Sequence, residues 1–179
     1  MLADIALALS IALGLLALYV ATRPGTFSVT RSALIAAPPA AVFPHVDTLR
    51  NWEAWSPWAK LDPSAKSSYS GPASGRDASF AWDGNRNVGS GRMTIVDSRP
   101  GERVAFRLDF EKPMKGTNDA VFTFVPEGNG TRVTWTMTGR NNFMAKAVNV
   151  VIDCNKMVGG MFDQGLADLA VIAEGKSAG

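Results

Sequence analysis

The chain has 179 residues, a formal net charge of +2, and 46% hydrophobic against 19% charged residues, a composition typical of one globular domain. Lys and Arg are scattered along the sequence, which argues against a nucleic-acid-binding protein, because such proteins cluster positive charge. A single cysteine, Cys154, and a single histidine, His45, exclude an internal disulfide and a metal site built from several Cys or His side chains. We therefore expect no metal and no cofactor.

The N-terminal segment is almost continuously apolar from Leu2 to Ala21, with Asp4 as its one charged residue. About 20 helical residues at about 1.5 Å each span the hydrocarbon core of a bilayer. A cleaved signal peptide is the alternative, but it calls for Lys or Arg before the apolar run and a small-x-small cleavage site, and both are poorly matched here. We predict an uncleaved single-pass anchor over residues 1–22 and a linker over 23–26. Arg23 follows the span and no basic residue precedes it, which predicts a cytoplasmic C-terminal domain.

The next segment predicts one strand and two short helices. Apolar and polar residues alternate from Phe27 to Ala36, which is typical of a strand, and Pro38 and Pro39 stop it. Residues 40–49 are expected to form a short helix, and residues 50–55 a second one that ends before Pro57.

From Lys66 onward the hydrophobic pattern has a period of two, which indicates further strands. We predict these strands at residues 66–70, 78–82, 87–98, 104–110, 118–126 and 132–138. Short turns join most of them, so the sheet should be largely antiparallel, with about seven strands. Glycines within residues 89–91 are expected to mark a bulge or bend. One face of this sheet is apolar and aromatic, and such a face needs a cover.

The segment from Asn142 to Glu174 is the one element long enough to cover that face. Apolar residues recur in it every three or four positions, which predicts one long helix. The pair Gly159 and Gly160 weakens the helix interior, so we expect a bend there. Residues 143–157 should line the open part of a cavity, and residues 161–172 should pack as core.

This order of elements, together with several local motifs, resembles the helix-grip fold of the START-like (SRPBCC) superfamily, in its polyketide cyclase/dehydrase-like branch. The motifs are AAPPAAVF at residues 36–43, WEAWSPW at 52–58, GTRVTW at 130–135 and FDQGLADL at 162–169. The resemblance implies an α+β domain over residues 27–175, with a curved antiparallel sheet wrapped around a long C-terminal helix, and leaves 176–179 as a tail. It also implies a hydrophobic cavity between the sheet and that helix.

Aromatic residues of the inner sheet face and apolar residues of the last helix are the candidate ligand contacts. They are Trp55, Trp58, Trp82, Phe106, Phe122, Trp135, Met137, Phe143, Val151, Cys154 and Met157. The alternative for each ring is that it plugs an end of the core, because a buried Trp contributes a large apolar area to packing.

The sequence offers no evident catalytic group. His45 and Asp47 do not share a helix face, and Asp109 and Asp119 alternate onto the outer face of their strands. Cys154 has no histidine nearby and is interpreted as a small buried hydrophobe.

Three functions are consistent with these features. The first is a membrane-anchored binding module for a hydrophobic small molecule, such as a lipid, a quinone-like or a polyketide-like compound. The second is a cyclase or dehydratase acting on such a ligand, for which a titratable side chain facing the cavity would be expected. The third is an interaction domain whose sheet and helix are fully packed.

Overall fold

The computed structural model describes residues 1–151 and 153–175, with the backbone alone described at Val151 and Cys154. A seven-stranded antiparallel sheet forms the body of the molecule, in the order β1-β7-β6-β5-β4-β3-β2. The strands are β1 (Thr26–Ile35), β2 (Lys66–Ser70), β3 (Ser79–Asp83), β4 (Ser90–Arg99), β5 (Arg103–Lys112), β6 (Gly116–Glu127) and β7 (Gly130–Arg140). Consecutive strands pair through short connections, and β1 closes the order against β7.

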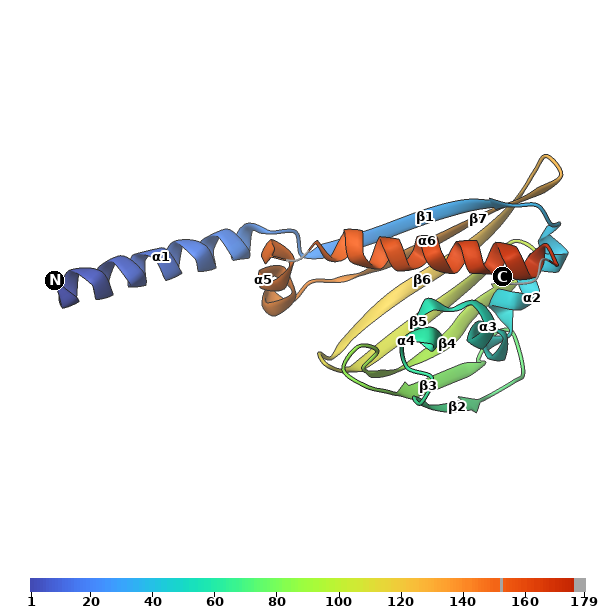
Figure 1. The fold of residues 1–179 in the computed structure, drawn as a ribbon, viewed down its shortest axis with the longest axis horizontal. Coiled ribbons are helices and arrows are strands. Elements are labelled where there is room, and N and C mark those ends of the chain that lie inside the picture. Colours follow the sequence, from blue (N-terminus) through green and yellow to red (C-terminus); the bar gives the residue numbers. More distant parts are fainter. Residues whose placement is uncertain (152, 176–179) are drawn as a thin grey trace.

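A long C-terminal helix, α6 (Cys154–Ala173), lies along β1 across the inner face of the curved sheet (Figure 1). Its buried stripe contains Phe162, Leu166 and Leu169, spaced so that they share one face of the helix. The predicted helix-grip fold is therefore confirmed.

The helix predicted over 142–174 is divided into α5 (Phe143–Val151) and α6, so the expected bend at Gly159 and Gly160 is wrong. The division has a local cause. The side chain of Asp153 accepts a hydrogen bond of 2.9 Å from the backbone N–H of Lys156 and so caps the start of a new helix. Gly159 instead allows close approach, because a Cβ there would overlap the guanidinium of Arg31 on β1.

Short helices close the opposite end of the sheet from α5. They are α2 (Pro39–Asp47), the 3-10 turn η1 (Leu49–Asn51), α3 (Trp52–Trp55) and α4 (Pro57–Leu61). Pro57 was expected to end the preceding helix, but it also begins α4, which was not predicted, because proline is well suited to the first position of a helix. The bulge expected near residues 89–91 is confirmed, since the β4–β5 register shifts between Ser90 and Gly91.

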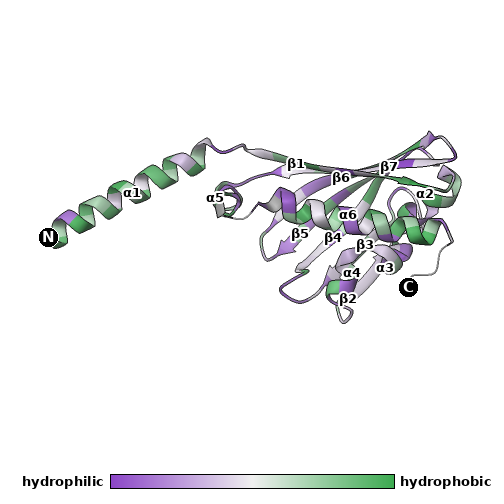
Figure 2. Cartoon of the chain, turned by 45° about the horizontal axis from the view of Figure 1, so that its top comes forward, coloured by the Kyte–Doolittle hydropathy of each residue, from purple (hydrophilic) through white to green (hydrophobic). Residues whose placement is uncertain are grey.

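The N-terminal helix α1 (Leu2–Thr22) extends away from the domain, and most of its residues are hydrophobic (Figure 2). By length and composition it is able to cross a membrane. Val20, near its C-terminal end, is the buried residue of this helix. The structure therefore presents a candidate span joined by three residues, 23–25, to a compact domain.

Candidate functional site: a pocket between sheet and helix

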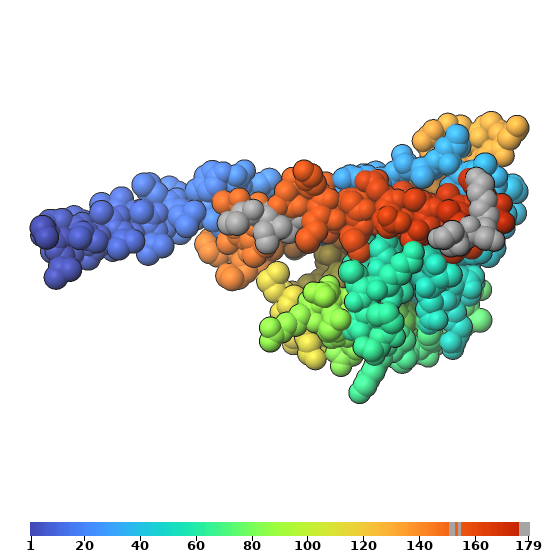
Figure 3. Space-filling model, viewed as in Figure 1, coloured from blue at the N-terminus to red at the C-terminus, as the bar shows by residue number. Residues whose placement is uncertain are grey.

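A pocket of about 1120 Å³ lies between the inner face of the sheet and helices α5 and α6. It appears as a hollow beneath α6 in the space-filling view (Figure 3). This volume is slightly above the range, about 300–1,000 Å³, that is typical of small-molecule sites. Most of its wall is apolar, with aromatic rings from α3, α4 and five of the strands: Phe27, Trp52, Trp58, Tyr69, Phe80, Trp82, Phe110 and Trp135.

The two ends of the sheet differ, and the pocket results from that difference. We call the end covered by α2, η1, α3 and α4 the packed end. Trp52 and Trp55 of α3 project there onto Phe106 and Phe122 of the sheet, and their ring centroids lie 5.4–6.1 Å apart. Trp55, Phe106 and Phe122 have no exposed surface. These edge-to-face contacts fill the space between sheet and helix.

We call the other end, where α1 joins the domain, the anchor end. The strand register brings to it the first residue of β1, the last residue of β7, and the connections 84–89 and 113–115. The short helix described at this end is α5. The side chains facing inward from the sheet include Ala120 and Leu108, and those from the helices include Ala145 and Val148, which are too small to meet across the gap.

Trp135 marks the boundary between the two ends. Its ring stacks on Phe162 of α6, with centroids 3.9 Å apart and planes 7° from parallel, and it also borders the pocket. The indole N–H of Trp135 is enclosed and has no hydrogen-bond partner among the described residues. In contrast, the indole N–H groups of Trp52 and Trp55 donate to the carbonyls of Val46 and His45. A buried donor without a partner costs free energy, so the indole N–H of Trp135 destabilises the fold at this point of the wall.

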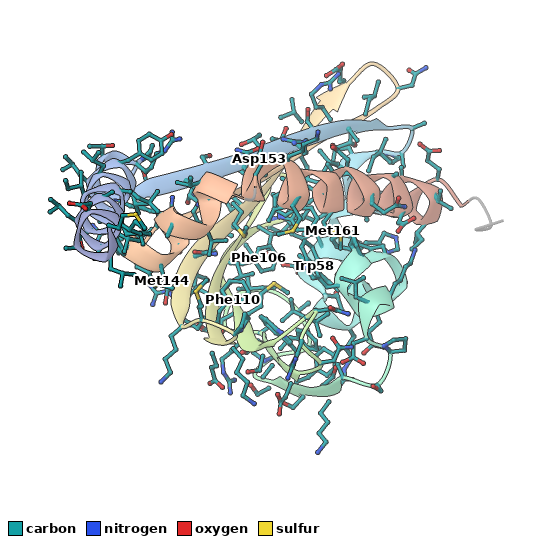
Figure 4. All side chains as sticks on the ribbon, turned by 60° about the vertical axis from the view of Figure 1, so that its left-hand side comes forward. Trp58, Phe106, Phe110, Met144, Asp153 and Met161 are labelled. Atoms are coloured by element: carbon teal, nitrogen blue, oxygen red, sulfur yellow. The ribbon has the colours of Figure 1, made fainter. Side chains whose placement is uncertain are left out.

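The structure distributes the predicted ligand contacts over several environments. Trp58, Trp82, Trp135 and Met137 lie on the pocket wall, and Figure 4 shows Trp58 below α6. Three others, Trp55, Phe106 and Phe122, lie in the core instead, because the ring of Trp52 packs on all of them and itself borders the pocket. Phe143 and Met157 are 53% and 58% exposed and face outward, because the helix is broken at Asp153 and its register differs from that of one continuous helix. The side chains of Val151 and Cys154 lie outside the described residues.

Several wall residues were missed by the sequence analysis. Phe110 was visible in the alternation of β5, on the same face as Leu108, and both line the pocket. Met114 and Val88 lie in connections between strands, where periodicity gives no signal. Tyr69 lies on the edge strand β2, which has a polar sequence.

Polar side chains on the wall form two groups. Near α3, the hydroxyl of Tyr69 donates to a carboxylate oxygen of Glu53 at 2.6 Å, and the guanidinium of Arg50 lies 4.2 Å from the Tyr69 ring centroid. Burial and the Glu53 carboxylate raise the pKa of Tyr69, which holds this phenol neutral. At the anchor end the amides of Asn118, Asn141, Asn149 and Asn155 border the opening.

The remaining titratable groups near the pocket have structural partners. Asp62 accepts hydrogen bonds from the Ser64 hydroxyl and from the backbone N–H groups of Ser64 and Asn85, and these bonds lower the pKa of Asp62. Asp153 caps α6. Burial lowers the pKa of His45, which is not among the residues that line the pocket. Among the described residues there is no group of three or more His, Cys, Asp or Glu side chains that could hold a metal ion.

Comparisons with known proteins agree with this architecture. The family model described as polyketide cyclase / dehydrase and lipid transport matches residues 26–174. A search of curated proteins gave no match. Protein MLL2253 from Mesorhizobium loti is similar in structure at 12% identity, with a TM-score of 0.62, over 85% of this chain and 100% of that one. Protein CV1439 from Chromobacterium violaceum is similar at 16% identity, with a TM-score of 0.59, over 85% and 99%.

A third similar structure is the di-domain ARO/CYC BexL from the BE-7585A biosynthetic pathway, at 19% identity and a TM-score of 0.61, over 89% of this chain and 54% of that one. At these identities the solved structures show the fold alone.

Proposed function

The chain belongs to the polyketide cyclase/dehydrase and lipid transport family, and from this premise we propose that it is a membrane-anchored binding protein for a hydrophobic small molecule. The observation that carries the proposal is the pocket of about 1120 Å³, with its aromatic wall, between the sheet and α6. Transfer of apolar surface from water to such a wall is favourable by about 25 cal/mol per Å². A lipid, a quinone-like or a polyketide-like molecule has the apolar body that this wall would cover.

The polar groups of the wall define how such a ligand would lie. The pair of Tyr69 and Glu53 is at one side of the pocket, and the amides of Asn118 and Asn149 border its opening at the anchor end. We infer a ligand with a long apolar body and hydrogen-bonding groups toward its ends. The neutral phenol of Tyr69 and the carboxylate of Glu53 offer hydrogen-bond acceptors to a hydroxyl or an amine of the ligand.

The candidate span α1 supports a location at a membrane, where ligands of this class partition. Arg23 at the end of α1 and Arg31 beyond it favour an orientation with the domain in the cytoplasm.

The test uses two tryptophan substitutions on adjacent residues of β7. Met137 lines the pocket, whereas Thr138 is exposed and points to the other face of the sheet. The full chain in detergent micelles is titrated with a fluorescent fatty acid and with quinones, and its bound lipids are extracted for mass spectrometry. We expect Met137→Trp to fill part of the pocket and to weaken binding at least about tenfold, which corresponds to about 1.4 kcal/mol, whereas Thr138→Trp binds as the parent does. Binding that both variants retain, or a parent that carries and binds none of these compounds, would contradict the proposal.

A second candidate function is catalysis on the bound ligand, as in a cyclase or dehydratase. The pair of Tyr69 and Glu53 favours it, because a phenol and a carboxylate in hydrogen-bond contact at a pocket wall are able to transfer protons. Turnover of aromatic polyketide substrates by the parent, lost in Tyr69→Phe and in Glu53→Gln while binding is retained, would support this function. If the parent and both variants bind the ligand equally and none of them turns it over, catalysis is contradicted and the binding function is retained.

A further inference from the structure

The anchor end of the domain gathers basic residues that are far apart in the sequence. The strand register and the two connections bring Lys66, Lys112 and Arg140 to this end, and helix α5 adds Lys146. The full set of basic residues is Arg23, Lys66, Arg86, Lys112, Lys115, Arg140 and Lys146; the acidic residues at this end are Asp62, Asp83, Glu111 and Asp153. Asp83 pairs with Lys112, whereas Asp62 accepts a hydrogen bond from the backbone N–H of Asn85 and keeps its charge. The seven basic residues outnumber the four acidic ones, so the net charge at this end is positive, in a chain whose overall net charge is +2.

Large apolar side chains are exposed between these basic residues. Met114, in the connection between β5 and β6, is 46% exposed, and Phe143 and Met144 of α5 are 53% and 60% exposed. Figure 4 shows Met144 on α5, beside α1. Exposed aromatic and methionine side chains surrounded by Lys and Arg are the composition of a surface that enters the headgroup region of a bilayer.

Helix α1 is fixed to this same surface. Lys146 of α5 donates from Nζ to the carbonyl of Ala21 at 3.2 Å, and Asn141 donates from its side chain to the carbonyl of Pro24 at 3.3 Å. Val20 is buried, with 4% exposure. If α1 spans a bilayer, its C-terminal end lies at the membrane surface, and these contacts hold α5 and its exposed side chains close to that surface.

Part of the pocket rim lies at the same end. Met114, Asn149, Asp153 and Asn155 line the pocket and are exposed there, whereas the exposed lining residues Glu53, Pro63 and Ser67 lie beside α3, α4 and β2. Met114 thus belongs both to the rim and to the exposed apolar set.

We propose that the anchor end lies on the surface of an anionic bilayer, with Met114, Phe143 and Met144 inserted among the headgroups, so that the pocket opens directly to the membrane. This inference rests on the membrane-anchored binding function proposed above and specifies the path of the ligand. An apolar molecule then passes from the bilayer to the pocket without crossing water, which avoids the cost of hydrating its surface.

The test places spin labels on the full chain in proteoliposomes. Single cysteines are introduced, in a Cys154→Ser background, by Met114→Cys and Phe143→Cys at the anchor end. The controls are Leu34→Cys and Val125→Cys, which replace exposed apolar residues toward the opposite end of the sheet, 53% and 55% exposed. Collisions of each label with oxygen, which concentrates in lipid, are compared with collisions with a water-soluble nickel complex. The vesicles contain phosphatidylcholine alone or phosphatidylcholine with phosphatidylglycerol.

We expect an oxygen-to-nickel ratio severalfold higher at positions 114 and 143 than at positions 34 and 125, with a larger difference in the anionic vesicles. The double variant Arg86→Gln, Lys115→Gln should reduce this difference, because each basic residue near an anionic surface contributes to its attraction. Equal, water-like ratios at all four positions would overturn the proposal. Shielding from both reagents at positions 114 and 143 would also overturn it, because it would indicate a second copy of the chain on this surface. A chain that fails to insert into the vesicles would overturn it as well.

The binding titration with Met137→Trp separates this inference from the function on which it rests. If the label positions do not differ but binding still depends on the pocket, membrane docking is contradicted and the binding function is supported. If the labels at the anchor end contact lipid but the chain binds no ligand, the binding function is contradicted and the docked surface is supported.

Discussion

The packed end and the anchor end are built from the same sheet and the same final helix, but they differ in what fills the space between them. At the packed end, α3 inserts Trp52 and Trp55 against the sheet, and the indole N–H groups of both have acceptors. At the anchor end, α5 presents smaller side chains, Ala145 and Val148, toward Ala120 and Leu108 of the sheet, and the space between them stays open. One fold therefore supplies both stability and a cavity, because the short helices cover only part of a face that α6 alone cannot fill.

The largest effect that tests this comparison is the loss of a ring from either end. Trp55 has no exposed surface, so Trp55→Ala should lower the free energy of unfolding by about 3–5 kcal/mol. Trp82 borders the pocket and is only partly buried, so Trp82→Ala leaves less new cavity and should cost about half as much. Thermal and denaturant unfolding of the two variants measures the difference. Equal losses would mean that the pocket wall is packed as tightly as the core.

A smaller effect separates Trp55, whose indole N–H has an acceptor, from Trp135, whose buried indole N–H has none among the described residues. Trp55→Phe removes the donor to the His45 carbonyl, a bond of 3.0 Å, and should cost about 1–3 kcal/mol. Trp135→Phe removes a buried N–H that has no partner among the described residues, so the lost ring volume is offset and the cost should be under about 1 kcal/mol. The two variants lose the same atoms, and each serves as the control for the other. A cost for Trp135→Phe as large as that for Trp55→Phe would show that this N–H has a partner in solution, such as water or a ligand.

Much of the fold was predictable, because hydrophobic periodicity reports which face of an element is buried. The alternation in β5 and β7 predicted the strands, and the apolar residues of 142–174 predicted the covering helix. The site was less predictable. Phe106 and Phe110 have the same pattern in the sequence, but α3 covers Phe106 and leaves Phe110 on the pocket wall. Only the placement of a helix more than fifty residues earlier in the chain decides between them, and periodicity carries no information about that placement.

The helix break illustrates the same limit. Two consecutive glycines suggested a bend at residues 159 and 160, whereas one capping side chain, Asp153, determines where α6 begins. Glycine lowers helix propensity by about 1 kcal/mol, which tertiary contacts override. The carboxylate of Asp153 accepts from the backbone N–H of Lys156, which has no acceptor within the helix because it lies in the first turn. An Asp three residues before a helical position is a capping pattern that can be read from the sequence.

The smallest effect concerns the two glycines at the point where α6 passes from the pocket to the core. An alanine Cβ at Gly160 meets no atom within 4 Å, so Gly160→Ala should stabilise the chain by about 0.5–1 kcal/mol through helix propensity. An alanine at Gly159 overlaps the guanidinium of Arg31, which pairs with Asp163 at 3.1 Å. Displacing Arg31 weakens that exposed ion pair, worth about 0–1 kcal/mol, and separates β1 from α6, so the gain in propensity should be cancelled or reversed. Unfolding of the two variants, compared with that of Arg31→Ala and of Arg31→Ala combined with Gly159→Ala, measures the contact. If Gly159→Ala stabilises as much as Gly160→Ala when Arg31 is present, the close approach of β1 to the helix does not require glycine. If Gly159→Ala stabilises the chain only in the Arg31→Ala background, glycine is required at position 159 to make room for the guanidinium.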